Sequence, residues 1–117
     1  MQSVLLLLSA PGYGSENAYT ALRLGRALLD EPEVELSIYL VGDAVVSAKK
    51  GQATPRGYYS LEKMLMVFTQ KGVSIGLCST CMDARGIKDS DLVEGAHRGS
   101  MEELAGLVRK SHKVLTF

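Results

Sequence analysis

The sequence has no excess of charge of either sign. Thirteen Lys and Arg residues balance thirteen Asp and Glu residues in a chain of 117, and no long basic run concentrates the positive charge. A protein that binds nucleic acid needs a basic face for the phosphates. The composition therefore argues against a nucleic-acid partner.

Long hydrophobic runs are also missing. The longest run, Val4 to Leu8, is much shorter than the roughly 20 residues that a membrane-spanning helix needs. No basic residue precedes it, and Pro11, Gly12 and Gly14 follow it where a secretory signal would have a small-residue cleavage site. We therefore expect a cytoplasmic protein with no membrane partner.

Cysteine is scarce, since Cys78 and Cys81 are the only two, with two residues between them. A chain of this length fits one domain and buries enough surface to fold without a disulfide or a structural metal. In a reducing cytosol, such a pair more often serves redox, nucleophilic or metal chemistry than a structural disulfide. The pair is therefore the first candidate for function.

Strand and helix patterns alternate along the chain. Short apolar runs predict strands at 3–9, 34–41, 73–77, 96–98 and 112–117. Helical patterns lie between them, and Ser15, Ser60 and Ser100 are expected to cap three of the helices, Ser100 within a capping box with Glu103. A short helix is expected at 44–49. This alternation predicts a single three-layer α/β/α domain with a mostly parallel five-stranded sheet.

Sheets of this kind bind ligands beyond the carboxyl ends of their strands, which here places the loops at 10–16, 42–59 and 78–86 on one functional edge. In the first loop, Gly12, Tyr13, Gly14 and Ser15 lead from strand to helix, and the glycines permit close approach of an anion. The loop lacks the Lys-Ser/Thr pair of a P-loop and the third glycine of a dinucleotide motif. It therefore does not favour nucleotide binding, whereas small-anion binding stays open.

Cys78 stands where the third strand ends and a turn begins, so backbone N–H groups of the following residues are expected to favour its thiolate. Arg85 lies one or two helical turns further on, where its charge is expected to lower the pKa of Cys78. His97 and His112 are assigned no catalytic role. We expect Cys78 to be the reactive thiol.

The Cys-x-x-Cys spacing is open to three chemical interpretations. A zinc site would need two further ligands, and no histidine or carboxylate lies at a recognisable spacing, so no metal and no cofactor are expected. A thioredoxin-like dithiol would follow a strand near the start of the chain and open a long helix. In the third interpretation, Cys78 is a sulfur carrier or nucleophile and Cys81 a resolving, modulating or structural neighbour.

The whole pattern resembles the DsrE/DsrF-like family, and most closely its YchN-like branch. The matching segments are 10–16, 22–24, 43–45, 57–58, 77–87 and 113–117, and the most specific of them holds Cys78, Cys81, Arg85 and Gly86. The resemblance implies a parallel five-stranded sheet and assembly into a homo-trimer or homo-hexamer. It also implies that Cys78 accepts sulfane sulfur as a persulfide from a donor protein and passes it to an acceptor protein, as sulfurtransferase-like members do.

Three functions follow as hypotheses. The first is a cytoplasmic sulfur relay through Cys78, with Cys81 and Arg85 supporting or modulating it. The alternative is a non-catalytic oligomeric protein that binds a small anion at the loop 10–16 or acts as a regulator. A thiol–disulfide oxidoreductase is the third. Aromatic and methionine side chains near the edge loops could supply oligomer contacts: Tyr13, Tyr58, Tyr59, Met64 and Met66.

Overall fold

Five parallel strands form the centre of the computed structural model, which describes residues 1–117. They are β1 (Gln2–Leu8), β2 (Val34–Leu40), β3 (Ser74–Cys78), β4 (Ala96–Gly99) and β5 (Lys113–Thr116). Their order across the sheet is β4-β3-β2-β1-β5, and every neighbouring pair is parallel. The predicted five-stranded parallel sheet is therefore confirmed.

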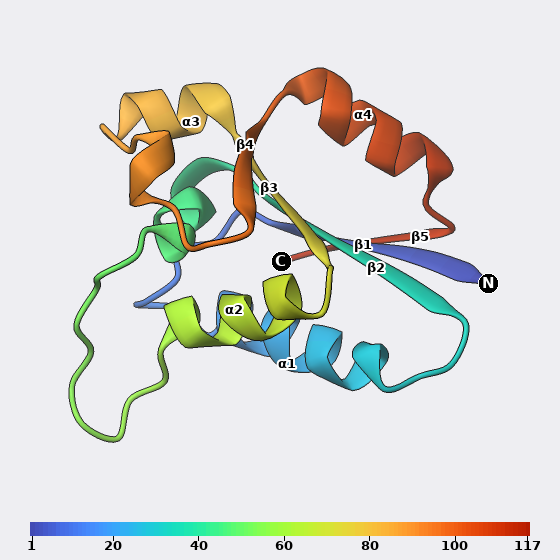
Figure 1. The fold of residues 1–117 in the computed structure, drawn as a ribbon, viewed down its shortest axis with the longest axis horizontal. Helices are drawn as coiled ribbons and strands as arrows, with labels where there is room; N and C mark the ends of the chain where they lie inside the picture. Colours follow the sequence, from blue (N-terminus) through green and yellow to red (C-terminus); the bar gives the residue numbers. More distant parts are fainter.

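Helices cross between the strands, as parallel pairing requires. They are α1 (Asn17–Leu29), α2 (Leu61–Gln70), α3 (Ser79–Ala84) and α4 (Met101–Lys110), with 3-10 helices η1 (Gly42–Ala48) and η2 (Asp89–Asp91). Figure 1 shows α1 and α2 side by side along one face of the sheet, with α4 over the other face and α3 at the end of β3. The layers are those of an α/β/α domain. None of the helices has the length and apolar character that a membrane crossing would require.

The main core lies between the sheet and the α1–α2 layer. Because side chains alternate along a strand, every second residue of the three central strands points to this layer. These buried side chains are Val4, Leu6, Leu8, Leu36, Ile38, Leu40, Ile75 and Leu77. They meet the buried faces of the two helices, which consist of Ala18, Ala21, Leu22, Gly25, Leu61, Leu65 and Phe68. The apolar runs of the strands thus reflect burial on both faces.

Two of the predicted helix caps are confirmed. The hydroxyl of Ser60 accepts a hydrogen bond from the Lys63 backbone N–H, and that of Ser100 accepts one from the Glu103 N–H. The capping box at Ser100 is only half formed, because the Glu103 carboxylate contacts Nε2 of His97 at 2.9 Å and not the Ser100 backbone. A side chain of β4 therefore replaces the Ser100 backbone as the partner of Glu103.

The expected cap of the first helix is wrong by one residue. Glu16 occupies the N-cap position of α1, and the Ser15 hydroxyl lies one residue outside the helix, where it accepts a hydrogen bond from the Asn17 N–H. The short helix expected at 44–49 is a 3-10 helix that begins two residues earlier, at Gly42. Both differences arise at strand-to-helix junctions, where turn geometry decides the boundary.

Candidate functional site

The loops that follow β1, β2 and β3 meet at the carboxyl edge of the sheet. The hydroxyl of Tyr13, in the first loop, accepts a hydrogen bond from the backbone N–H of Leu61 at 3.0 Å. The backbone N–H of Gly42, after β2, donates to the sulfur of Cys81 at 3.2 Å. The first contact fastens the loop after β1 to the start of α2, and the second joins the segments after β2 and β3; Gly12 of the first loop also packs against Ser47 of the second segment.

The two cysteines lie in direct contact at this edge. Cys78 is the last residue of β3 and the N-cap of α3, and Cys81 lies in the first turn of that helix. Their sulfur atoms are 2.7 Å apart and the Cys81 thiol donates to Cys78, while both cysteines are free. The Thr80 hydroxyl lies 3.4 Å from the Cys78 sulfur. Cys78 is 7% exposed, and Cys81 is only half-buried.

Hydrogen bonds give the two thiols opposite tendencies to ionise. Burial raises the pKa of Cys78, but hydrogen bonds from the side chains and backbone N–H groups of Cys81 and Thr80 outweigh it, so the pKa is lowered. Burial and the donation to Cys78 raise the pKa of Cys81, although the N–H of Gly42 and the charge of Arg85 oppose this shift. The geometry therefore favours a thiolate at Cys78 and a protonated Cys81.

Arg85 contacts the backbone of Cys81. Its guanidinium donates to the Cys81 backbone carbonyl at 3.1 Å and to the Asp43 carboxylate at 2.8 Å. The same side chain therefore holds α3 against the loop after β2. The expected positive charge is present at the site, where it acts to lower the pKa of Cys81.

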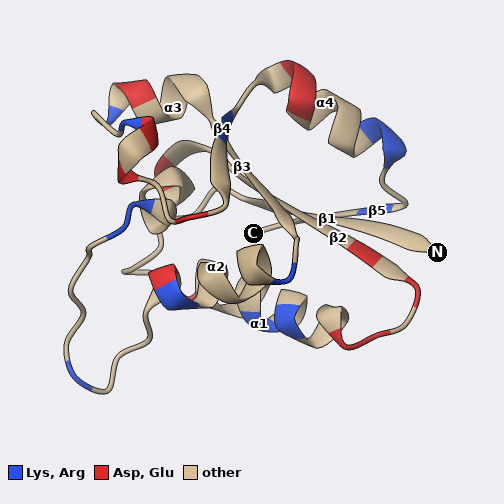
Figure 2. Ribbon diagram, viewed as in Figure 1, with Lys and Arg blue, Asp and Glu red and all other residues tan.

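A second arginine, Arg98 on β4, was not singled out from the sequence. Its guanidinium donates to the backbone carbonyl and hydroxyl of Ser79, and to the carboxylates of Asp83 and Asp89. Figure 2 shows the resulting mixture of opposite charges around α3 and the turn after it. Arg98 thus anchors the residue directly after Cys78, and nothing in the local sequence signals a contact across 19 residues.

The polar groups of the loop Gly12–Ser15 are largely used within the protein. Gly12 faces the side chains of Leu61 and Ser47 so closely that a Cβ atom would collide with both, so its role here is close approach of the backbone. The adjoining cavities, of about 470 and 240 Å³, are lined by Glu16 and Asp43 respectively and by no basic side chain. Small-anion binding at this loop stays a prediction, and the acidic side chains in these cavities do not favour it.

Four tyrosines stack on one another beside this loop. Tyr19 and Tyr59 have ring centroids 4.3 Å apart, Tyr58 and Tyr59 4.7 Å, and Tyr13 and Tyr59 5.5 Å. The guanidinium of Arg23 lies 5.5 Å from the Tyr19 ring centroid. The tyrosines expected to supply oligomer contacts therefore already contact each other within one chain, although Tyr58 remains 49% exposed.

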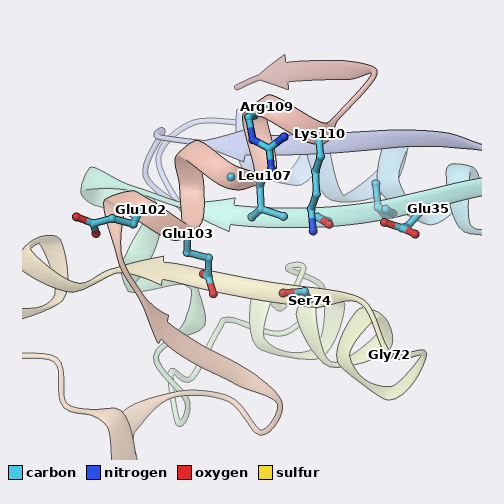
Figure 3. Close-up of a pocket in the computed structure, with 11 residues that line it drawn as sticks. Glu35, Gly72, Ser74, Glu102, Glu103, Leu107, Arg109 and Lys110 are labelled. Atoms are coloured by element: carbon cyan, nitrogen blue, oxygen red, sulfur yellow. The ribbon is translucent and has the colours of Figure 1, made fainter.

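A cavity of about 610 Å³ opens between α4 and the strands β2 and β3. Figure 3 shows Glu103 and Lys110 of α4 facing the sheet across it, with Glu35 and Ser74 on the strand side. Neither cysteine lines this cavity. No three His, Cys, Asp or Glu side chains in the structure are grouped so that they could hold a metal ion. The thiol pair therefore remains the candidate functional site at the carboxyl edge of the sheet.

The chain is similar to known proteins over its full length. The sequence profile described as "DsrE/DsrF-like family" matches residues 2–117. The chain is 37% identical over 118 residues to the protein YchN of Escherichia coli, with 100% of both chains covered. The crystal structure of YchN superposes on this fold with a TM-score of 0.94, again over the whole of both chains.

Two further relatives extend the comparison. An uncharacterized protein of Methanocaldococcus jannaschii is 36% identical over 117 residues, covering 100% of each chain. The sulfurtransferase TusD of Salmonella arizonae is more distant, with 28% identity over 85 residues, which is 72% of this chain and 66% of TusD.

Proposed function

Because the chain belongs to the DsrE/DsrF-like family, we propose that it is a sulfur-relay protein in which Cys78 accepts sulfane sulfur as a persulfide and passes it on. The observation that carries this proposal is the set of donors around the Cys78 sulfur. The Cys81 thiol, the Thr80 hydroxyl and two backbone N–H groups lower the pKa of Cys78 despite its burial. A thiolate is the nucleophile that such a transfer needs. The distant likeness to the sulfurtransferase TusD supports the same class of chemistry.

In the proposed reaction, the Cys78 thiolate attacks the outer sulfur of a donor persulfide. The bond between the two donor sulfurs breaks, the donor leaves as a thiolate, and Cys78 carries the outer sulfur as a persulfide. An acceptor thiolate then attacks that outer sulfur and Cys78 leaves as a thiolate. Cys81 and Arg85 act as supporting residues, since Cys81 donates to Cys78 and Arg85 holds the Cys81 backbone.

We further propose that the protein acts in the cytoplasm as a homo-trimer or homo-hexamer that meets separate donor and acceptor proteins. The family resemblance supports this assembly, as do the exposed apolar side chains of Tyr58, Met101 and Val108. Light scattering at micromolar concentration is the direct test. A monomer under these conditions would contradict the proposed assembly without affecting the chemistry proposed for Cys78.

The transfer proposal is tested with glutathione persulfide and intact-mass spectrometry. Because the chain has only two cysteines, single serine variants locate any adduct. We expect Cys81→Ser to gain the mass of one sulfur atom and Cys78→Ser to gain none. Equal labelling of the two variants, or no sulfur adduct on either, would overturn the assignment of Cys78 as the acceptor.

A further inference from the structure

Cys81 lies closer to Cys78 than a simple sulfur carrier requires. A relay protein needs one thiol, yet here a second sulfur lies 2.7 Å from the first and has its own hydrogen-bond donor in the Gly42 N–H. No other cysteine exists in the chain to exchange with either of them. The second thiol must therefore be explained at this site.

We propose that Cys81 resolves the Cys78 persulfide and releases the carried sulfur as hydrogen sulfide, which makes the protein a persulfide reductase as well as a sulfur acceptor. This inference rests on the proposed function, because Cys78 must first carry the sulfur. It assigns a further product, sulfide, and a further co-reactant, an external dithiol that restores the two thiols.

The contact between the two sulfurs supports direct attack. Cys78 is the N-cap of α3 and Cys81 lies three residues later, a spacing that places both side chains on one face of a helical turn. Attack on the inner sulfur of the persulfide therefore needs no large movement of the backbone. A reaction between groups already held together gains greatly over the same reaction between separate molecules.

The surroundings of Cys81 supply what a resolving thiol needs. As Cys81 loses its proton, negative charge develops on its sulfur, and the Gly42 N–H already points at that atom at 3.2 Å. Arg85 adds positive charge through its contact with the Cys81 carbonyl, and Asp43 holds the guanidinium there. Both groups favour the ionised form of Cys81. They therefore assist the step in which Cys81 becomes a nucleophile.

The burial of Cys78 also favours the internal reaction. Cys78 is 7% exposed, so a large external thiol has little room to approach its inner sulfur, whereas Cys81 already touches it. Cys81 is the more exposed residue of the two. An external dithiol can therefore reach the Cys81 side of the resulting disulfide.

The chemistry balances without any further oxidant. The Cys81 sulfur forms a bond to the Cys78 sulfur, the bond between the inner and outer persulfide sulfurs breaks, and the outer sulfur leaves with the proton lost by Cys81 as hydrogen sulfide. The sulfane sulfur gains two electrons, and the two cysteines lose two as they form a disulfide. A dithiol then reduces this disulfide by thiol–disulfide exchange and is itself oxidised to a disulfide.

In the experiment, a substoichiometric amount of glutathione persulfide is added to each of four proteins. They are the wild type, Cys81→Ser, Cys81→Ala and the double variant in which both cysteines are replaced by serine. Sulfide release and intact mass are followed together. We expect the wild type to release one sulfide for each disulfide formed. We expect the two Cys81 variants to keep a single added sulfur on Cys78 and to release sulfide at least about tenfold more slowly, because the internal attack is lost. The double variant measures release from the donor alone.

The outcomes separate the two proposals. If the Cys81 variants carry one sulfur and the wild type carries it equally long without releasing sulfide, the reductase is overturned while the carrier stands. If neither Cys81 variant gains a sulfur, the proposed function itself fails. A glutathione adduct on the Cys81 variants, accompanied by immediate sulfide release, would also overturn the inference, since the donor would then have been attacked at its inner sulfur.

Discussion

The backbone N–H of Gly42 donates a hydrogen bond of 3.2 Å to the sulfur of Cys81. This contact joins the turn after β2 to the helix after β3, across 39 residues of sequence. Gly42 has a φ of 56°, in the left-handed region that glycine adopts without strain. The orientation of this N–H therefore depends on the residue type at position 42.

Gly42→Ala tests that dependence. The nearest atom to an added Cβ is 3.7 Å away, so the cost is conformational and about 1 to 2 kcal/mol. A shifted N–H would raise the pKa of Cys81, so that less thiolate is present near neutral pH. We therefore expect slower alkylation of Cys81, measured by mass spectrometry of the peptide that contains it. Gly57→Ala is the matched control, since Gly57 has a φ of 82° and open space around it. Equal slowing in both variants would contradict a specific role for the Gly42 N–H.

Thr80→Val tests the lowered pKa of Cys78. The substitution keeps the shape of the side chain and removes the hydroxyl that lies 3.4 Å from the Cys78 sulfur. With one donor lost, the pKa of Cys78 should rise, so that less thiolate is present at a given pH below it. We expect the pH midpoint of Cys78 alkylation by iodoacetamide to move upward. Thr54→Val, in the loop between η1 and α2, should leave the midpoint where it is.

Arg98→Ala tests the anchoring of α3. The variant loses the contacts to Ser79, Asp83 and Asp89, but both carboxylates are largely exposed, so water screens each ion pair and its contribution to stability is small. We expect a modest loss of stability in urea and faster amide hydrogen exchange concentrated in α3. Arg26→Ala removes one exposed pair with Asp30 and serves as the control. Unchanged exchange in α3 would show that the helix is held by its other contacts.

Tyr39→Phe tests a buried phenol beneath α4. Burial, then the charge of Glu103, raises the pKa of Tyr39 to about 12, and its hydroxyl donates to the Ser100 carbonyl at 2.9 Å. A raised pKa stabilises the folded state below the unfolded value of 10.0, and this stability is lost as the pH rises through about 12. We expect the variant to be less stable by about 1 kcal/mol at neutral pH. The difference in free energy of unfolding between wild type and variant should become smaller as the pH rises from 10.0 to about 12.

Urea unfolding at several pH values measures this gap. Comparing the two proteins removes the contribution of lysines and other tyrosines that titrate in the same range, because both proteins contain them. A gap that widens with increasing pH would contradict the assigned direction of the Tyr39 shift.

Local patterns were sufficient for much of the fold. Ser60 and Ser100 cap helices as expected, because a cap depends on residues only three positions apart. The unbroken apolar runs predicted buried parallel strands, since a strand covered on both faces has no polar side. The Ser15 cap failed because a one-residue difference in the turn moved the helix start to Asn17.

The candidate site was only partly predictable. The spacing of Cys78 and Cys81, at the end of a strand, was enough to expect two neighbouring thiols and a favoured thiolate. Arg98 was missed because its partners lie 9 to 19 residues away, in α3 and η2. The contact of Arg85 with Asp43 was missed for the same reason, at a separation of 42 residues.

The sequence by itself determined the succession of strands and helices along the chain, the helix caps at Ser60 and Ser100, and the position of both thiols at a strand end. Short-range periodicity and turn residues encode these features. Only the tertiary structure decided which groups surround each sulfur. The Gly42 N–H reaches Cys81, and the Asp43 carboxylate reaches Arg85, because parallel pairing of β2 with β3 places the carboxyl ends of these strands side by side. The hydrogen bond that assists ionisation of Cys81, and with it the proposed resolving role, depends on that placement.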